Sequence, residues 1–333
     1  MSSIQIALTG ATGFIGQHLL NALLFNAPYQ DEAHGLSPAP RGISAHDVHV
    51  RALIRNPKRA PIAGLQMPGG DSRLDWIEGD LNNTEALERL VSGAEVVIHN
   101  AGVVRGRSAE DFLKVNADGT ERIALAARKA GVKHFILVSS LAAREPQLSH
   151  YAYSKAGAES RLKALADLNW SIVRPPAVYG PGDKELAPLF DSMRKGVGAH
   201  PAGADSRFSV IHVSDLARFM RQLAWSGLAL DDNPKPFGHT FEPDDGSGGY
   251  RWEDIRQCAE QAFQRKVRMI AVPRFVLSTV AQMNHWSSGL LSYAPMLTPG
   301  KVNELTHHDW TCSPLPIALP WQAQVSLSQG LLE

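Results

Sequence analysis

The chain has 333 residues, 44% of them hydrophobic, and its 33 basic and 33 acidic side chains cancel to a formal net charge of zero. This length allows a large α/β domain with a smaller lobe, and the lack of net positive charge argues against a nucleic-acid partner. Cys258 and Cys312 are the only cysteines, which excludes a disulfide framework. No signal peptide or membrane-spanning stretch is visible, so we expect a cytoplasmic protein without an integral membrane segment.

The N-terminal residues predict a binding site for a dinucleotide pyrophosphate. Ile4, Ile6 and Leu8 alternate with smaller or polar residues as in a strand, and residues 18–24 have helical spacing. The glycines between them suit a tight turn, a close approach of the backbone to a diphosphate, and close packing of the helix on the strand. The first N–H groups of the helix then face the anion. The residues expected to hold the diphosphate are Gly10, Thr12, Gly13, Phe14, Ile15 and Gly16.

Strands and helices alternate after a Pro- and Gly-rich segment at 27–47, which we expect to be an inserted surface loop. The expected strands are 48–54, 76–80, 95–99, 135–138 and 170–173, and the expected helices are 84–91, 118–130 and 151–168. The strands are continuous apolar runs, which predicts a parallel sheet covered by helices on both faces. His34, His46 and His49 match no metal-ligand spacing, so we expect no metal site.

The predicted fold class is therefore α/β, with a Rossmann-type doubly wound parallel sheet and a smaller C-terminal lobe. We expect an NAD(P)-binding domain at 1–180, with 207–225 returning to it, and a substrate-binding lobe at 181–333. The lobe contains an apolar segment at 272–297. We expect most of this segment to form core or interface, and less of it to line a pocket or rest on a membrane surface.

The end of the second expected strand bears on the choice of cofactor. NAD-binding folds of this kind carry an acidic residue there, whereas a basic residue suits the 2′-phosphate of NADP. This strand is followed by Arg55, with Lys58 and Arg59 close behind, so NADP(H) is favoured over NAD. The alternative is that Arg55 only caps an exposed strand end. Asp80, after the third strand, either accepts a hydrogen bond from the adenine amino group or caps the helix that follows.

A tyrosine and a lysine form the expected catalytic pair. Tyr151 and Lys155 stand four residues apart on a predicted helix, so their side chains share a face. An ammonium group beside a phenol favours the phenolate, which predicts a lowered pKa for Tyr151 and a role as general acid/base. Ser140 ends the preceding strand, where its hydroxyl can hold a substrate oxygen. Tyr153 points to another face and is not expected to take part.

Further motifs follow in order along residues 1–220. They are TGATGFIG at 9–16, GDL at 79–81, HNAG at 99–102, VNADGT at 115–120, VSS at 138–140, YAYSK at 151–155, RPPAVYGPGD at 174–183 and VIHVSDLA at 210–217. Together they resemble the extended branch of the short-chain dehydrogenase/reductase superfamily. This branch includes nucleotide-sugar epimerases and dehydratases, dihydroflavonol and cinnamoyl reductases, and 3β-hydroxysteroid dehydrogenases.

The resemblance implies roles for the matching residues. Tyr151 would be the general acid/base, and Lys155 would lower its pKa and bind the nicotinamide ribose. Ser140, rather than Ser139, would orient the substrate. Asn116 would kink its helix and hold a water of the proton relay, although an ordinary helix N-cap explains this residue as well. The other residues that the resemblance places at the cofactor are Asp80, Leu81, Asn100, Ala101, Gly102 and Pro175.

Departures from the family pattern narrow the substrate. Leu141 and Ala142 stand where sugar-nucleotide dehydratases carry an Asp-Glu pair that moves protons, so a dehydratase is disfavoured. Ala177 stands where many nucleotide-sugar enzymes carry an asparagine that grips the diphosphate. His212 lies either near the substrate or simply at a helix start.

These observations favour an NADP(H)-dependent oxidoreductase that interconverts a carbonyl and an alcohol on a small, largely apolar substrate. The first alternative is a nucleotide-sugar epimerase with tightly bound NAD, against which Arg55 and Ala177 count. The second is a non-catalytic NAD(P)-binding protein with a redox-sensing or assembly role, against which the complete catalytic set counts. The resemblance is also compatible with a homodimer built on the helices at 118–130 and 151–168.

Overall fold

The computed structural model describes residues 4–25, 48–56, 72–201, 206–228, 238–291, 295, 297–316 and 321–333. Its centre is a seven-stranded sheet, parallel throughout as predicted, with the strand order β11-β6-β5-β4-β1-β2-β3. The strands are β1 (Ile4–Thr9), β2 (Val48–Ile54), β3 (Leu74–Glu78), β4 (Val96–His99), β5 (His134–Val138), β6 (Trp170–Val173) and β11 (Gly238–Phe241).

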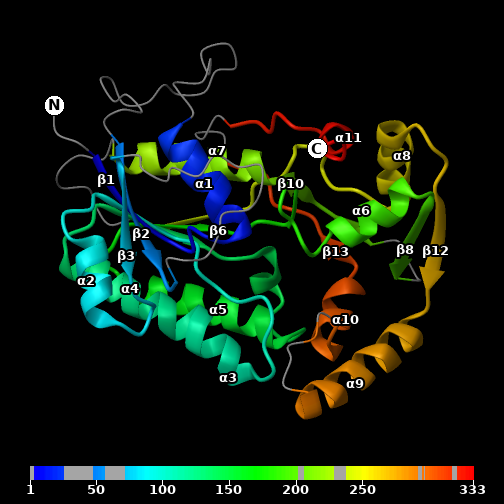
Figure 1. Ribbon diagram of the computed structural model, residues 1–333, viewed down its shortest axis with the longest axis horizontal. Helices are drawn as coiled ribbons and strands as arrows, with labels where there is room; N and C mark the ends of the chain where they lie inside the picture. The colour runs from blue at the N-terminus through cyan, green and yellow to red at the C-terminus, as the bar shows by residue number, and fades with distance from the viewer. Residues whose placement is uncertain are drawn as a thin grey trace.

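Helices cover both faces of this sheet (Figure 1). One face carries α1 (Phe14–Leu24) and α7 (Val213–Leu228), and the other carries α2 (Thr84–Val91), α4 (Asp118–Lys129) and α5 (His150–Lys163). Strand β1 contributes to both cores, since Ile6 and Leu8 pack with α1 and α7 while Ala7 packs on the opposite side. Strands buried on both faces explain the continuous apolar runs in the sequence.

The order of the strands creates a crevice at the carboxyl edge of the sheet. β2 and β3 extend the sheet on one side of β1, and β4, β5 and β6 extend it on the other. At such a reversal the loops after the two central strands separate, and open α/β folds bind ligands there. The glycine turn follows β1 and residues 100–102 follow β4, so both predicted cofactor motifs lie at this point.

A smaller lobe lies beyond this edge, on the right of Figure 1. Its short parallel pairs are β7 (Ala177–Tyr179) with β10 (Val210–His212), β8 (Val197–Pro201) with β12 (Arg268–Val272), and β9 (Arg207–Phe208) with β13 (Asp309–Trp310). Its helices are α6 (Ala187–Arg194), α8 (Trp252–Phe263), α9 (Arg274–Leu291), α10 (Pro299–Leu305) and α11 (Leu327–Gly330).

Two elements differ from the expectation because of contacts between distant segments. Helix α5 ends at Lys163, not at residue 168, and the chain then makes short turns that bring Leu168 into the core. Strand β11 joins the main sheet beside β6, although the sequence analysis assigns its residues to the substrate-binding lobe.

The segment at 272–297 is expected to form core or interface, and the expectation of core is wrong for the outer face of α9, because Phe275 and Trp286 are each 72% exposed. The expected loop at 27–47, with His34 and His46, lies outside the described residues, as do Lys58 and Arg59.

Candidate active site

A cavity of about 1040 Å³ lies between the carboxyl edge of the sheet and the smaller lobe. The sheet side contributes Ser140 and Tyr151, and the lobe contributes residues around β9, β13 and α10. Much of the lining is apolar, including Phe112, Leu141, Val178, Phe208, Trp252 and Leu297. The cavity therefore offers the two predicted polar groups to a substrate inside a largely apolar space.

The glycine turn after β1 has the shape that a diphosphate requires. Gly10 has a φ of +73°, and a Cβ atom there would lie 2.6 Å from the carbonyl carbon of Asn100. A Cβ atom on Gly16 would lie 2.0 Å from the Gly10 oxygen, so α1 packs directly on the turn. Gly13 is the N-cap of α1, and no side chain caps this helix. The helix start is thus open to an anion, and the turn fits a dinucleotide pyrophosphate.

Neighbouring residues of this turn lie where the cavity meets α1. Phe14 and Ile15 line the cavity. The half-buried Thr12 accepts a hydrogen bond through its carbonyl oxygen from Gln17 Nε2 at 3.0 Å. The carbonyl oxygen of Gly10 accepts one from Asn100 Nδ2 at 3.3 Å, which ties the turn to the loop after β4.

The residues expected at the adenosine end lie on two neighbouring loops, which follow β2 and β3. Arg55 follows β2 directly and is exposed. Asp80 accepts a hydrogen bond from Asn82 N at 2.8 Å, whereas Asn83 caps α2 by accepting one from Ala86 N, so the alternative of Asp80 as the helix cap is wrong. Leu81 is buried and packs against α4, where a Cβ atom on Gly119 would lie 2.7 Å from its side chain.

The loop after β4 brings several predicted residues together. Ala101 N donates to Thr9 Oγ1 at 3.1 Å. A Cβ atom on Gly102 would lie 3.1 Å from Asn116 Oδ1 and 3.4 Å from Lys155 Nζ. A larger residue at Gly102 would press on both groups, so this loop, Asn116 and Lys155 form one compact site.

Asn116 lies in a π-helical turn (Leu113–Ala117) between α3 (Ala109–Phe112) and α4. The expected kink is therefore present, and π-helical turns frequently mark functional sites. Its side chain accepts from Val103 N at 2.8 Å and donates to Val103 O and Ser154 Oγ. The alternative of an ordinary N-cap is wrong, because the amide bonds to another loop and to α5.

A histidine that the sequence analysis did not single out connects these loops. The buried ring of His99 contacts Thr9 Oγ1 at 2.7 Å through Nδ1 and Thr120 Oγ1 at 3.1 Å through Nε2. Thr120 donates its own proton to the Asn116 carbonyl oxygen, so it accepts from Nε2–H, and Nδ1 accepts from Thr9. Burial, together with the charge of Lys155, holds the pKa of His99 at about 3, which keeps the ring neutral.

Ser139 and Ser140 have different surroundings. The buried Ser139 hydroxyl donates to Glu159 Oε1 at 2.7 Å. Ser140 lines the cavity, where its hydroxyl acts to lower the pKa of Tyr151, and it accepts a hydrogen bond of 3.2 Å from Ala142 N. The geometry therefore favours Ser140 as the residue that meets a substrate.

Burial sets the pKa of Tyr151, and the expectation of a lowered value is wrong for this state of the protein. Burial raises the pKa of Tyr151 to about 12, and the charges of Glu304 and Glu185 add to the rise, while the hydrogen bond with Ser140 opposes it. The phenolate would lose its hydration in this apolar surrounding. Tyr151 consequently remains protonated at neutral pH. Tyr153 is 55% exposed, but it also lines the cavity, so the expectation that it points away from the site holds only in part.

Lys155 lies beneath the cavity on the same side of α5 as Tyr151. Its ammonium group donates to Val138 O at 2.9 Å, at the end of β5. Burial lowers the pKa of Lys155 to about 8, although the charge of Glu159 opposes this shift. This lysine is therefore poised closer to neutral pH than an exposed one.

A buried ionic network supports the Ser139–Ser140 segment from behind. Glu159 accepts from Arg174 Nε at 2.8 Å and from Nη2 at 2.7 Å. Burial disfavours the charge of Glu159, but the hydrogen bonds from Arg174 and Ser139 outweigh it, and its pKa lies below the usual range. Arg174 also donates to Glu242 Oε1 at 3.3 Å, which carries the network into the strand β11 region.

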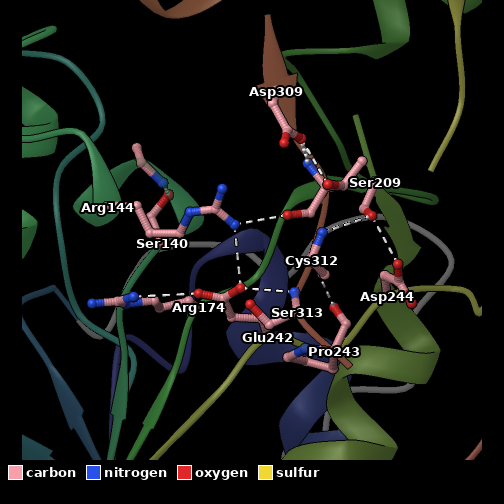
Figure 2. Close-up of polar contacts among 12 residues, drawn as sticks. Ser140, Arg144, Arg174, Ser209, Glu242, Pro243, Asp244, Asp309, Cys312 and Ser313 are labelled. Atoms are coloured by element: carbon pink, nitrogen blue, oxygen red, sulfur yellow. Dashed lines mark hydrogen bonds and ion pairs between the residues drawn. The ribbon is translucent and has the colours of Figure 1, made fainter. Parts of the chain in front are cut away.

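Figure 2 shows how Glu242 continues this network toward the C-terminal segment. Its carboxylate accepts from Arg144 at 3.4 Å and from Ser313 N at 2.9 Å. Arg144, in the short 3₁₀ turn that follows Ser140, also donates to Thr311 O at 2.7 Å. The sequence analysis missed these charged residues, because nothing local marks an Arg or Glu whose partner lies about a hundred positions away.

Pro175, Ala177 and His212 differ in their placement. Pro175 and Ala177 both line the cavity. His212 is 1% exposed and lies outside the cavity lining, with its ring 5.2 Å from that of Tyr179 and its Nε2 3.4 Å from Glu333. We therefore withdraw the expected substrate contact for His212. Among the described residues, no group of three His, Cys, Asp or Glu side chains is placed to hold a metal ion.

Comparison with known proteins identifies a matching family model and similar enzymes. The model of the NAD(P)H-binding family matches residues 39–224. A ceramide reductase of Caulobacter vibrioides is 38% identical over 330 residues, which cover 98% of this chain and 91% of the relative. The UDP-glucose 4-epimerase of Vibrio cholerae is 27% identical over 282 residues, covering 77% of this chain and 75% of the relative.

The fold is also found in solved structures of low sequence identity. A dTDP-glucose 4,6-dehydratase of Streptomyces venezuelae with NAD bound superposes with a TM-score of 0.68 at 19% identity, covering 99% of this chain and 95% of that one. The fold, the matching family model and the similarity to enzymes over nearly the whole chain agree. This chain is an enzyme of the extended short-chain dehydrogenase/reductase superfamily, whose members are NAD(P)-dependent oxidoreductases, epimerases and dehydratases.

Proposed function

We propose that this enzyme is an NADP(H)-dependent oxidoreductase that interconverts a carbonyl and an alcohol on a largely apolar, lipid-like substrate. The observation that carries the proposal is the placement of Tyr151, protonated at neutral pH, together with Ser140 in the wall of a largely apolar cavity. The similarity to a ceramide reductase supports a lipid-like substrate class. Leu141 and Ala177, both in the cavity lining, offer a sugar diphosphate no polar group.

The preference for NADP(H) rests on Arg55. Its guanidinium group is exposed at the end of β2, beside the crevice at β1 and β4, and no acidic residue follows that strand directly. A 2′-phosphate at this place would gain a charge-assisted hydrogen bond, whereas an acidic residue would repel it. The glycine turn, Ala101 and Gly102 would hold the rest of the dinucleotide, and Lys155 its nicotinamide ribose.

The residues of the cavity suit the direction of reduction. A bound reduced dinucleotide supplies the hydride to the carbonyl carbon. Ser140 and Tyr151 orient the carbonyl oxygen by hydrogen bonds, and Tyr151, un-ionised at neutral pH, donates its proton to that oxygen. Lys155 stabilises the phenolate that remains, one helical turn away, until the tyrosine regains a proton. In the reverse direction Tyr151 as phenolate removes the proton of the alcohol.

Carbonyl reduction by Tyr151→Phe tests the proton-transfer role. We expect kcat to fall by roughly 100-fold or more while the thermal shift on adding NADP⁺ stays unchanged. Tyr250→Phe removes a tyrosine hydroxyl that bonds to Asp245 outside the cavity lining and is the matched control. Undiminished turnover by Tyr151→Phe would falsify the proposed chemistry.

The same assay distinguishes the substrate classes. With ketones of increasing chain length, kcat/KM should rise by up to roughly fourfold for each methylene buried in the cavity, following its transfer free energy. A strong thermal shift with UDP-glucose, without turnover of any ketone, would instead support the nucleotide-sugar epimerase. The similarity of the chain to a UDP-glucose 4-epimerase is the observation that supports this second candidate function.

A further inference from the structure

Helix α9 has one face packed against the protein and one face exposed to solvent. Leu277, Ala281 and Asn284 point inward, where Asn284 Nδ2 donates to Leu297 O at 3.3 Å. The opposite face carries large apolar side chains in the open, namely Phe275, Val276, Val280, Met283 and Trp286. Their spacing puts them on one side of the helix, and Figure 1 shows α9 at the edge of the molecule with α10 on its inner side. A continuous apolar face of this kind marks an interaction surface.

The charges around α9 indicate what this surface meets. Between Arg265 and Asn303 the sequence contains five basic residues and no acidic one. Arg274, the first residue of α9, is exposed, and so are Arg265, Lys266 and Arg268, which lie before or at the start of β12, the strand that leads into α9. Basic residues beside an exposed apolar helix face match the surface of a bilayer that contains anionic lipids. A second copy of the chain fits less well, since a symmetric contact would bring these positive charges together.

No helix among the described residues is long and apolar enough to cross a membrane. With its inner face bound to the protein, α9 suits a position in the plane of the membrane interface, with its outer side chains among the headgroups and upper acyl chains.

The same helix borders the catalytic cavity. Gln282, next to Met283, lines the cavity, as does Leu297, which accepts the hydrogen bond from α9. Arg274 donates to Asn303 Oδ1 at 3.0 Å, and Asn303 Nδ2 donates to Leu148 O at 3.1 Å, directly before the catalytic helix α5. The apolar face is thus joined to the rim of the site that contains Tyr151.

We infer that the outer face of α9 and the basic residues before it dock this enzyme onto an anionic lipid bilayer, with the mouth of the cavity beside the membrane. A lipid-like substrate then moves from the bilayer into the cavity without crossing water. The route for the substrate rests on the proposed function, whereas the docking itself does not.

Vesicle flotation of the full chain tests the docking. We expect the protein to float with vesicles of equal parts phosphatidylcholine and phosphatidylglycerol, and less with phosphatidylcholine alone. The triple variant Phe275→Ser/Met283→Ser/Trp286→Ser should reduce the floating fraction by about tenfold or more. The variant Arg265→Glu/Lys266→Glu/Arg268→Glu should remove the preference for phosphatidylglycerol. Trp76→Ser/Leu332→Ser, which changes exposed apolar residues elsewhere, is the matched control and should float like the unmodified protein.

Two outcomes would overturn the inference. One is that the unmodified protein floats with neither vesicle at low salt. The other is a dimer in sedimentation velocity that the triple variant abolishes, which would give the face to a second copy. Turnover of a short, water-soluble ketone separates this inference from the proposed function, because the triple variant should retain it. Flotation without any ketone turnover contradicts the function alone, and turnover without flotation contradicts the docking alone.

Discussion

Lys155 keeps a charged group inside the fold at a cost to the stability of the folded protein. Its ammonium group is buried, with the Val138 carbonyl oxygen as its hydrogen-bond partner, and burial lowers its pKa to about 8. A charge kept in such a place destabilises the folded protein at any pH below that value. The same position lets its charge act on a phenolate at Tyr151.

Lys155→Met should therefore make the protein more stable but inactive. The fall of the lysine pKa from 10.5 to about 8 corresponds to roughly 3 kcal/mol, and the lost hydrogen bond to Val138 returns about 1 kcal/mol, which leaves a gain of roughly 2 kcal/mol at pH 7. Between pH 8 and 10.5 the unfolded chain binds a proton that the folded one does not, so the unmodified protein gains stability as pH rises. The advantage of the variant in thermal unfolding should shrink over that range. An advantage that is independent of pH would contradict the buried charge.

At the scale of elements, the proposed preference for NADP(H) over NAD depends on one residue in the loop after β2. Arg55 is exposed and follows β2 without an intervening residue, so its replacement has little reason to disturb the sheet. Arg55→Asp exchanges a charge-assisted partner of a 2′-phosphate for a group that suits a 2′-hydroxyl.

We expect Arg55→Asp to shift the ratio of NADP⁺ to NAD⁺ affinity toward NAD⁺ by about 30-fold or more, as measured by titration calorimetry. Arg128→Asp, at an exposed arginine of α4, is the control and should leave this ratio unchanged. An unaltered ratio in Arg55→Asp would mean that Arg55 only ends an exposed strand.

Local sequence patterns predicted the elements whose reasons are themselves local. The strand, glycine turn and helix at residues 4–24 follow from hydrophobic spacing and from the backbone freedom of glycine, and the parallel sheet follows from apolar runs. The place of β11 could not be predicted, because it depends on pairing with β6, far back in the chain. The outer face of α9 escaped prediction since an apolar pattern does not tell core from exposed surface.

In the candidate site too, local features could be predicted from the sequence and those that depend on distant contacts could not. The spacing of Tyr151 and Lys155 placed both on one helix, but the raised pKa of Tyr151 follows from how deeply three-dimensional packing buries the phenol. The sequence did not mark Glu242 as part of the site, because its role depends on hydrogen-bond partners from three separate segments of the chain.

In the whole molecule, Glu242 joins the sheet to the end of the chain. Its carboxylate is 6% exposed and meets Arg144 from the loop after Ser140, Arg174 from the end of β6, and the backbone of Ser313 (Figure 2). Burial disfavours its charge, but these partners outweigh burial, and the pKa of Glu242 lies below the usual range. The wall of the cavity therefore depends on contacts between segments that lie far apart in the sequence.

Glu242→Gln should destabilise the protein by about 2 kcal/mol at pH 7, because two half-buried guanidinium groups lose a charged partner. A carboxyl group whose folded pKa is lowered contributes stability above its unfolded pKa and loses it as pH falls. The difference in melting temperature between this variant and the unmodified protein should therefore narrow below about pH 4.5. Glu88→Gln, which removes an exposed carboxylate paired with Lys129, is the control, and an equal effect there would deny Glu242 its linking role.

The neutral ring of His99 carries a consequence for observing this enzyme at work. It is bonded on one side to Thr9, the residue that leads into the glycine turn, and on the other to Thr120, which bonds to the main chain of Asn116. Any rearrangement that a dinucleotide imposes on either loop must alter one of these two contacts. The nuclear magnetic resonance shifts of its two ring nitrogens should therefore report dinucleotide binding without a probe attached to the catalytic residues.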